Sequence, residues 1–145
     1  MQSLSPSQLT LLIHDQTYCV AKLLPQHWDC ELLTLEGCEN SFFSVSRTSD
    51  EVSIVCAQSS QSLRELSDRN AQLEKDWVLI QVEGQLEFDM VGVIAFFSNL
   101  FADASLSIFC LSTFDTDYFL VKRIQFKEAL AALDQNNITW KELDA

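Results

Sequence analysis

Apolar and polar residues alternate with a period of two in the first half of the chain, which predicts short β-strands. Residues 9–13 and 18–24 form one such pair, and the polar residues 14–17 between them predict a turn. A second pair, residues 43–45 and 52–56, flanks another polar segment. We therefore expect two β-hairpins in this half, the second with one half-buried face.

Helical and irregular segments are predicted next. Residues 62–73 place leucines among charged residues, which favours a short, exposed helix, and residues 25–41 carry the breaks of a loop. The second half predicts a longer series of elements. In chain order these are a buried strand at 77–82, a helix at 90–103 with Asp89 as its N-cap, strands at 106–111 and 118–121, a helix from about Gln125 that Asn136 ends, and a last strand at 138–143.

The order of elements in the second half is strand, helix, strand, strand, helix, strand. This is the order of the ferredoxin-like βαββαβ unit, an α+β fold in which two helices cover one face of an antiparallel sheet. A shift of 66 residues aligns Ser46 with Ser112, so the first half carries a related hairpin and helix but no clear first helix. Because the aligned segment is short and hairpins are common, spacing alone leaves a duplication open.

Composition and charge argue against some classes of binding partner. The chain has 145 residues, 48% of them apolar, which is enough to build a folded core. Its net charge of −12 is spread evenly and there is no basic cluster, which argues against a nucleic-acid partner and against binding to an anionic membrane. The longest apolar block, residues 90–102, is too short to cross a bilayer, and no basic and apolar leader follows Met1. We therefore expect a cytoplasmic protein.

Motifs for catalysis or metal binding do not stand out in the sequence. Cys19, His27, Cys30 and Cys38 are close together, but their spacing fits no common zinc site. The five cysteines are odd in number and form no Cys-x-x-Cys pair, which indicates reduced thiols. Neither histidine lies in a motif that would activate a thiol, and the three glycines are too scattered for a phosphate loop. The sequence therefore predicts no catalytic residue, no metal ligand, no cofactor and no enzyme activity.

Three segments carry a family resemblance: residues 43–56, the Val-Glu-Gly segment 82–84, and residues 107–121, a serine-rich strand followed by Ser-Thr-Phe-Asp-Thr-Asp. They resemble the small bacterial tandem ACT-domain proteins, which are similar in turn to the CASTOR arginine sensors of animal cells. The resemblance implies two ferredoxin-like ACT domains, residues 1–72 and 73–145, the first of them degenerate. It also implies a non-catalytic role and a small molecule bound at an interface between ACT domains.

The resemblance further implies which residues contact the ligand. Thr113, Phe114 and Asp117 match ligand-contacting positions in one domain, and Ser107 and Ile108 match positions in its partner domain. Since side chains alternate along a strand, at most one of the Ser107 and Ile108 side chains faces a given pocket.

The chemistry of an amino acid points to the same region. Glu83, Gly84 and Gln85 begin a loop that precedes a predicted helix, whose first N–H groups attract a carboxylate. Asp117 follows a turn, where its carboxylate is able to accept a charge-assisted bond from an ammonium or guanidinium group. The loop departs from the family pattern, because Gln85 stands where proline is usual and Gly92 is a single glycine among bulky residues.

Some of these residues also have a purely structural interpretation. Asp117 is a favoured residue for a tight turn, Glu83 suits a solvated strand end, and Phe114 suits packing in a core or interface. From the sequence we therefore expect a regulatory homodimer that binds an amino acid or a similar small molecule. The alternative is a structural or protein-interaction module of the same fold that has lost its ligand.

Overall fold

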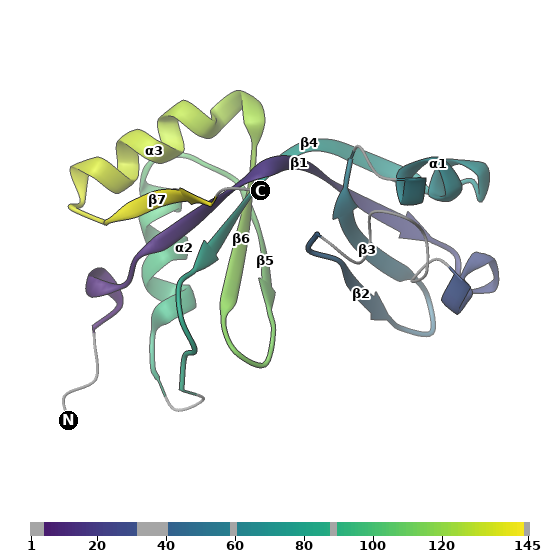
Figure 1. Ribbon diagram of the computed structural model, residues 1–145, viewed down its shortest axis with the longest axis horizontal. Coiled ribbons are helices and arrows are strands. Elements are labelled where there is room, and N and C mark those ends of the chain that lie inside the picture. The colour runs from purple at the N-terminus through teal and green to yellow at the C-terminus, as the bar shows by residue number, and fades with distance from the viewer. Residues whose placement is uncertain (1–4, 32–40, 59–60, 88–89, 144–145) are drawn as a thin grey trace. The chain divides into compact units, whose positions relative to one another are not determined.

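The computed structural model describes residues 5–31, 41–58, 61–87 and 90–143, and its fold is of the mixed α+β class (Figure 1). The helices are α1 (Gln61–Asp68), α2 (Val93–Asp103) and α3 (Phe126–Gln135), with 3-10 helices at Pro6–Gln8, Pro25–His27 and Arg123–Gln125. The strands are β1 (Leu11–Leu23), β2 (Ser44–Arg47), β3 (Val52–Ala57), β4 (Gln72–Val82), β5 (Ile108–Ser112), β6 (Asp117–Lys122) and β7 (Trp140–Leu143). No helix in these described ranges is long and apolar enough to cross a membrane.

Two compact units divide the chain, and one is inserted into the sequence of the other. The inserted unit is Gln16–Trp77, and the discontinuous unit joins Met1–Asp15 to Val78–Ala145. The long strands β1 and β4 each contribute residues to both units. The units therefore change at residues 15/16 and 77/78, while the division of the sequence into residues 1–72 and 73–145 stays a prediction.

The discontinuous unit is a curled sheet with α2 and α3 packed on one face. Its strands follow the order β7, β1, β4, β6, β5, with β5 and β6 antiparallel and β7 parallel to β1. Since every second residue of a strand faces the same side, β4 directs Val78, Ile80 and Val82 into the core. There Phe97 of α2 packs against Phe119 of β6, with 5.7 Å between the ring centroids. Burial of these side chains is what holds both helices on the sheet.

The inserted unit has a smaller core. β2 and β3 form an antiparallel hairpin, and β1 pairs with the other side of β3. The shared core of these strands and α1 consists of Ala21, Leu23, Val52, Ile54, Cys56 and Leu66.

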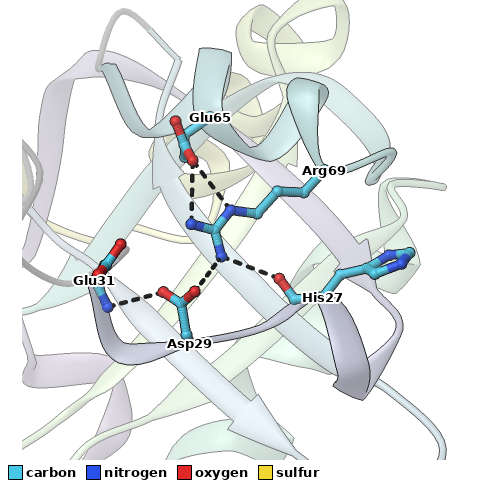
Figure 2. Close-up of polar contacts among 5 residues, drawn as sticks. All are labelled: His27, Asp29, Glu31, Glu65 and Arg69. Carbon is cyan, nitrogen blue, oxygen red and sulfur yellow. Dashed lines mark hydrogen bonds and ion pairs between the residues drawn. The ribbon is translucent and has the colours of Figure 1, made fainter.

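Arg69 connects the end of α1 to the segment that follows β1 through hydrogen bonds and ion pairs (Figure 2). Its Nε and Nη2 both donate to Oε1 of Glu65, at 3.2 and 3.1 Å. Its Nη1 donates to the His27 carbonyl at 3.1 Å and lies 3.0 Å from Oδ2 of Asp29. The other oxygen of Asp29 accepts the N–H of Glu31 at 3.0 Å. One guanidinium group thus links a helix end to a 3-10 turn far away in the sequence.

The two hairpins share the geometry of their loops. The Thr48 N–H donates to the Glu51 carbonyl at 2.9 Å, and the Thr113 N–H donates to the Thr116 carbonyl at the same distance. Thr48 and Thr113 are 65 residues apart, as are the first residues of α1 and α3. The observed repeat is therefore one residue shorter than the alignment of Ser46 with Ser112 suggested.

Several predicted elements are confirmed by the structure, namely the β2–β3 hairpin, the β5–β6 hairpin, the last helix and the last strand. The hairpin predicted at residues 9–24 is wrong, because β1 is one continuous strand through residues 14–17. The polar residues there stay extended because they remain in the ladder. The Thr17 carbonyl accepts the Gln58 N–H at 2.8 Å, and Tyr18 pairs with Ala57.

The start of α2 also differs from the prediction. The helix begins at Val93, and Gly92 is its N-cap with φ +88°, a left-handed conformation that glycine adopts at low cost. The predicted start at residue 90 is therefore wrong, and the predicted cap, Asp89, lies outside the described residues. β4 begins at Gln72, so Leu73 belongs to this strand and not to the preceding helix.

Candidate functional site

A cavity of about 400 Å³ opens at one end of the sheet of the discontinuous unit. Three segments form its walls: the loop after β4, the first turn of α2 and the loop between β5 and β6. The lining residues are Leu86, Glu87, Met90, Gly92, Val93, Ile94, Ala95, Ser112, Thr113, Phe114, Asp115, Thr116 and Asp117.

The β5–β6 loop is held in place by Thr116. Its side chain is 3% exposed, and its hydroxyl donates to the Val82 carbonyl, at the end of β4, over 2.6 Å. Next to it, the Asp115 carbonyl accepts the Leu86 N–H at 2.6 Å. Within the loop, the Thr113 hydroxyl donates to the Thr116 carbonyl at 3.2 Å. Two walls of the cavity are therefore joined by short hydrogen bonds from residues distant in sequence.

The first turn of α2 supplies backbone donors to the cavity. The N-cap, Gly92, has no side chain to bond these groups, and its carbonyl accepts the Phe96 N–H at 2.8 Å. The N–H groups of Val93, Ile94 and Ala95 precede the first intrahelical donor, and all three residues line the cavity. This end of the helix carries the positive end of the helix dipole, which favours a negatively charged group.

Carboxylates give the cavity its charge. Glu87, Asp115 and Asp117 line it, and none of the described lining residues is basic. The Ser112 hydroxyl donates to Oδ1 of Asp117 at 2.6 Å, which fixes the orientation of this carboxylate. The geometry thus combines acceptors for a cation with the N–H donors of α2.

The same acids act on two titratable neighbours. Burial raises the pKa of the Tyr118 phenol, and the charge of Asp115 raises it further, against a smaller effect of the hydrogen bond from Thr113. Burial also raises the pKa of the Cys110 thiol, and Asp117 adds to that shift. Burial and the neighbouring carboxylates therefore disfavour negative charge on these two side chains of β5 and β6.

The residues predicted from the sequence divide into two groups. Thr113, Phe114 and Asp117 line the cavity. The other residues, which lie off its lining, are Glu83, Gly84, Gln85, Ser107 and Ile108.

Gln85 and Ser107 are exposed, and the other three residues have structural contacts or conformations of their own. Nζ of Lys141 lies 2.8 Å from Oε2 of Glu83, so this carboxylate forms an ion pair at the end of β4. Gly84 has φ +95°, which lets the chain turn out of β4. Ile108 packs against the core from the start of β5. The sequence did not predict that Glu87, Ile94 and Thr116 line the cavity. Only Thr116 had a signal in the sequence, because it follows Thr113 by three residues in the same polar loop.

Metal ligands do not gather in the described part of the chain, where no group of three or more His, Cys, Asp or Glu residues could hold an ion. Cys38, one member of the group considered from the sequence, lies outside the described residues.

Part of the chain matches a known protein family. Residues 72–135 match the ACT domain family. This segment contains every residue that lines the cavity and supports an ACT-type protein. Among curated proteins, none matches the chain.

Solved structures share the fold at low sequence identity. A protein from Agobacterium tumefaciens has a TM-score of 0.77 and 22% identity, over 95% of this chain and 96% of that one. Aspartate kinase from Clostridium acetobutylicum, described as an allosteric enzyme, has a TM-score of 0.69 and 10% identity, over 93% of this chain and 36% of the kinase. The ligand-free regulatory subunit of aspartate kinase from Thermus thermophilus has a TM-score of 0.58 and 11% identity, over 84% of this chain and 94% of the subunit. At these identities, the likenesses show the fold alone.

Proposed function

We propose that this ACT-type protein is a non-catalytic regulatory or sensory module that binds an amino acid in the cavity beside the β5–β6 loop. The observation that carries the proposal is the composition of that cavity: backbone donors on one wall and carboxylates on another. Its volume of about 400 Å³ lies within the range of small-molecule sites. The likeness to regulatory subunits of aspartate kinase supports a regulatory role.

An amino acid fits this arrangement in one orientation. Its carboxylate would accept hydrogen bonds from the first turn of α2, and its ammonium group would lie near Asp117. Thr113 and Phe114 would contact the ligand from the same loop. Because Glu87 and Asp115 add negative charge and the described part of the lining holds no basic residue, a cationic side chain such as that of arginine or lysine is favoured over an acidic one. Glu83, Gly84 and Gln85 would shape the loop that leads to the cavity.

We also propose that the chain holds two ACT-type domains with related folds. The repeated hairpin loops support this, and so do the ends of the helices. Asn70 after α1 and Asn137 after α3 both adopt the left-handed conformation, with φ of +63° and +58°. In each case a backbone N–H beyond the asparagine bonds back into the helix, Ala71 to Leu66 and Ile138 to Leu133. The odd number of cysteines supports a cytoplasmic location for such a protein.

A second candidate function is a protein-interaction module without a ligand. Exposed apolar side chains around the cavity favour this second function. Single apolar residues are common on protein surfaces, whereas a group of them marks a contact site. Phe114 is 79% exposed, Val91 87% and Ile94 42%. A partner protein that covers these side chains would close the cavity.

A thermal-shift screen with the twenty amino acids separates these functions. A ligand at a hundred times its dissociation constant stabilises the fold by about 2.7 kcal/mol, a shift of several degrees. Asp117→Asn should abolish the shift and leave the unliganded Tm nearly unchanged, since asparagine still accepts the Ser112 hydroxyl. Asp103→Asn, which removes one exposed carboxylate at the far end of α2, is the matched control and should keep the shift.

Two results would contradict the proposal. If no amino acid raises the Tm, the interaction module is favoured. If Asp117→Asn lowers the unliganded Tm and leaves the ligand-induced shift intact, Asp117 has the turn-closing role and does not contact the ligand.

A further inference from the structure

A second cavity, of about 210 Å³, lies on the face of the sheet that α2 and α3 cover. All of its lining residues belong to the discontinuous unit. The first cavity, beside the β5–β6 loop, adjoins Val82 at the end of β4, whose carbonyl Thr116 binds. The second cavity is lined by Val78, four residues earlier in β4 and therefore about 13 Å away along the strand. The two cavities thus lie at opposite ends of the same strands.

Two carboxylates reach the second cavity from neighbouring strands. Ile13 of β1 belongs to the core under the helices, and side chains alternate along a strand, so Asp15 faces the same side. Glu142 of β7 is the direct partner of Ile13 in the ladder and also faces that side. His14 faces the opposite side, where its Nε2 lies 2.9 Å from Oε1 of Gln81. The cavity therefore receives both carboxylates but not the imidazole ring.

A guanidinium group lies on the other side of the second cavity. The strands follow the order β7, β1, β4, β6, and Arg123 comes directly after β6, so β4 separates it from both acids. Adjacent strands are about 4.8 Å apart, which places the backbones of β1 and β6 about 10 Å from each other. The floor between them is apolar, because Val78 is 1% exposed and Phe126 packs against the same core. The second cavity thus has a negative side, an apolar floor and a positive side.

The three charged groups of this cavity are not used within the described chain. Over residues 5–31, 41–58, 61–87 and 90–143, no ion pair or side-chain hydrogen bond involves Asp15, Arg123 or Glu142. They do not pair with one another either, which agrees with their separation across β4. Elsewhere in the same unit a lysine does find an acid, since Nζ of Lys141 lies 2.8 Å from Oε2 of Glu83. Both sides of the second cavity therefore keep their capacity for a group of opposite charge.

We propose that the second cavity binds a linear ω-amino acid, in which an aliphatic chain separates an ammonium group from a carboxylate. The ammonium group lies between Asp15 and Glu142 and donates to both carboxylates. The ligand carboxylate accepts two parallel N–H bonds from the guanidinium group of Arg123. The methylene chain covers the apolar floor formed by Ile13 and Val78, which removes more apolar surface from water.

The separation of the charges excludes simpler ligands. In an α-amino acid the ammonium and carboxylate groups share one carbon atom, so the molecule is too short to pair with both sides. A monocarboxylate leaves both acids unpaired and is repelled by them, and a simple amine leaves the guanidinium group unpaired. Lysine carries an ω-ammonium group as well, but its α-ammonium group would lie beside Arg123 and be repelled. The second cavity therefore selects a different class of compound from the first.

Amide NMR of the full chain, titrated with δ-aminovalerate, tests this site. We expect the signals of Asp15, Val78 and Phe126 to shift with one dissociation constant of about 1 mM or below, as for a ligand of this size. The signals of Thr113 and Ile94, at the first cavity, should not shift. Norvaline, the isomer with its ammonium group beside the carboxylate, and valerate, which lacks the ammonium group, should bind about tenfold more weakly at the second cavity. The proposal is overturned if the three signals stay unchanged at about 20 mM δ-aminovalerate, or if valerate binds equally well.

Variants at exposed positions test the two sides of the cavity separately. Arg123→Gln should weaken binding of δ-aminovalerate about tenfold, because it removes the guanidinium group. Lys127→Gln removes a cation of α3 that does not line the cavity and should bind as the wild type does. For the negative side, Glu142→Gln should also weaken binding, and Glu128→Gln is its matched control. A lining variant that binds as tightly as its control contradicts the proposal.

The same variants separate this proposal from the proposed function of the first cavity. Arg123→Gln leaves the first cavity unchanged, so any thermal shift with an α-amino acid should persist in it. In the same way, Asp117→Asn should keep its affinity for δ-aminovalerate. Loss of δ-aminovalerate binding in Asp117→Asn with full binding in Arg123→Gln would place this ligand in the first cavity and overturn the second site.

Discussion

Thr116→Val removes the single hydroxyl that ties the β5–β6 loop to β4. Thr116 is 3% exposed, and its hydrogen bond to the Val82 carbonyl is 2.6 Å long. Valine has nearly the same shape, so the change deletes this buried hydrogen bond and removes the hydroxyl donor from the Val82 carbonyl, at a cost of about 1–3 kcal/mol. In a chain of this length each kcal/mol lowers the Tm by about 2–4 °C, so we expect a decrease of roughly 2–12 °C.

Differential scanning calorimetry and urea unfolding measure this loss. Thr116→Ser keeps the hydroxyl and should retain more of the stability than Thr116→Val. Thr139→Val makes the same chemical change at an exposed position of the same unit and should stay within about 0.5 kcal/mol of the wild type. If Thr116→Val and Thr139→Val have equal Tm values, the buried hydrogen bond does not hold the loop and the reasoning is wrong.

Two further predictions concern charged groups. Arg69→Lys keeps the positive charge but loses the forked guanidinium group that joins Glu65 to Asp29. The free energy of unfolding should fall by up to about 1 kcal/mol, a small effect because both carboxylates are partly exposed. If urea unfolding shows a more stable variant, this prediction is wrong. Asp115→Asn should lower the pKa of Tyr118 towards its ordinary value of about 10, as followed by NMR of the ring. Since the folded pKa is raised, stability should be lost as the pH rises through it, and less steeply so in Tyr118→Phe.

Local signals in the sequence predicted the elements that depend on near neighbours. The hairpin between β5 and β6 needs only alternating residues and a polar loop, and both are visible in residues 106–121. The last helix was predictable because Ala129 and Leu133 lie one turn apart on the same face. In both cases the residues that carry the predictive pattern are near neighbours in the sequence.

The predictions from the sequence were wrong where the backbone conformation depends on more than the local pattern. Residues 14–17 are as polar as a turn, yet β1 continues through them because residues far away in sequence pair with them: the Gln58 N–H bonds to the Thr17 carbonyl, and Leu143 pairs with His14. At α2, the left-handed backbone of Gly92 sets the start of the helix, although the apolar pattern begins earlier. Propensity in a short window contains no information about such partners.

The candidate site shows the same division. Thr113, Phe114 and Asp117 were predicted together, and one hairpin loop does bring them to the cavity. Glu87 and Ile94 reach the same cavity from other segments. The bond from Leu86 to Asp115 and the bond from Thr116 to Val82 create this arrangement. No pattern along the chain encodes them.

By itself, the sequence determined the β2–β3 and β5–β6 hairpins, the last helix with its apolar face and the acidity of the chain. These properties follow from residue chemistry and from hydrogen bonds between neighbours. Only the tertiary structure decided that β1 and β4 each contribute to two units, that a cavity forms beside α2, and which of the 21 acidic residues line it. Those features depend on pairing and burial between residues far apart in sequence, where the entropy lost on chain closure must be outweighed by the whole packed core.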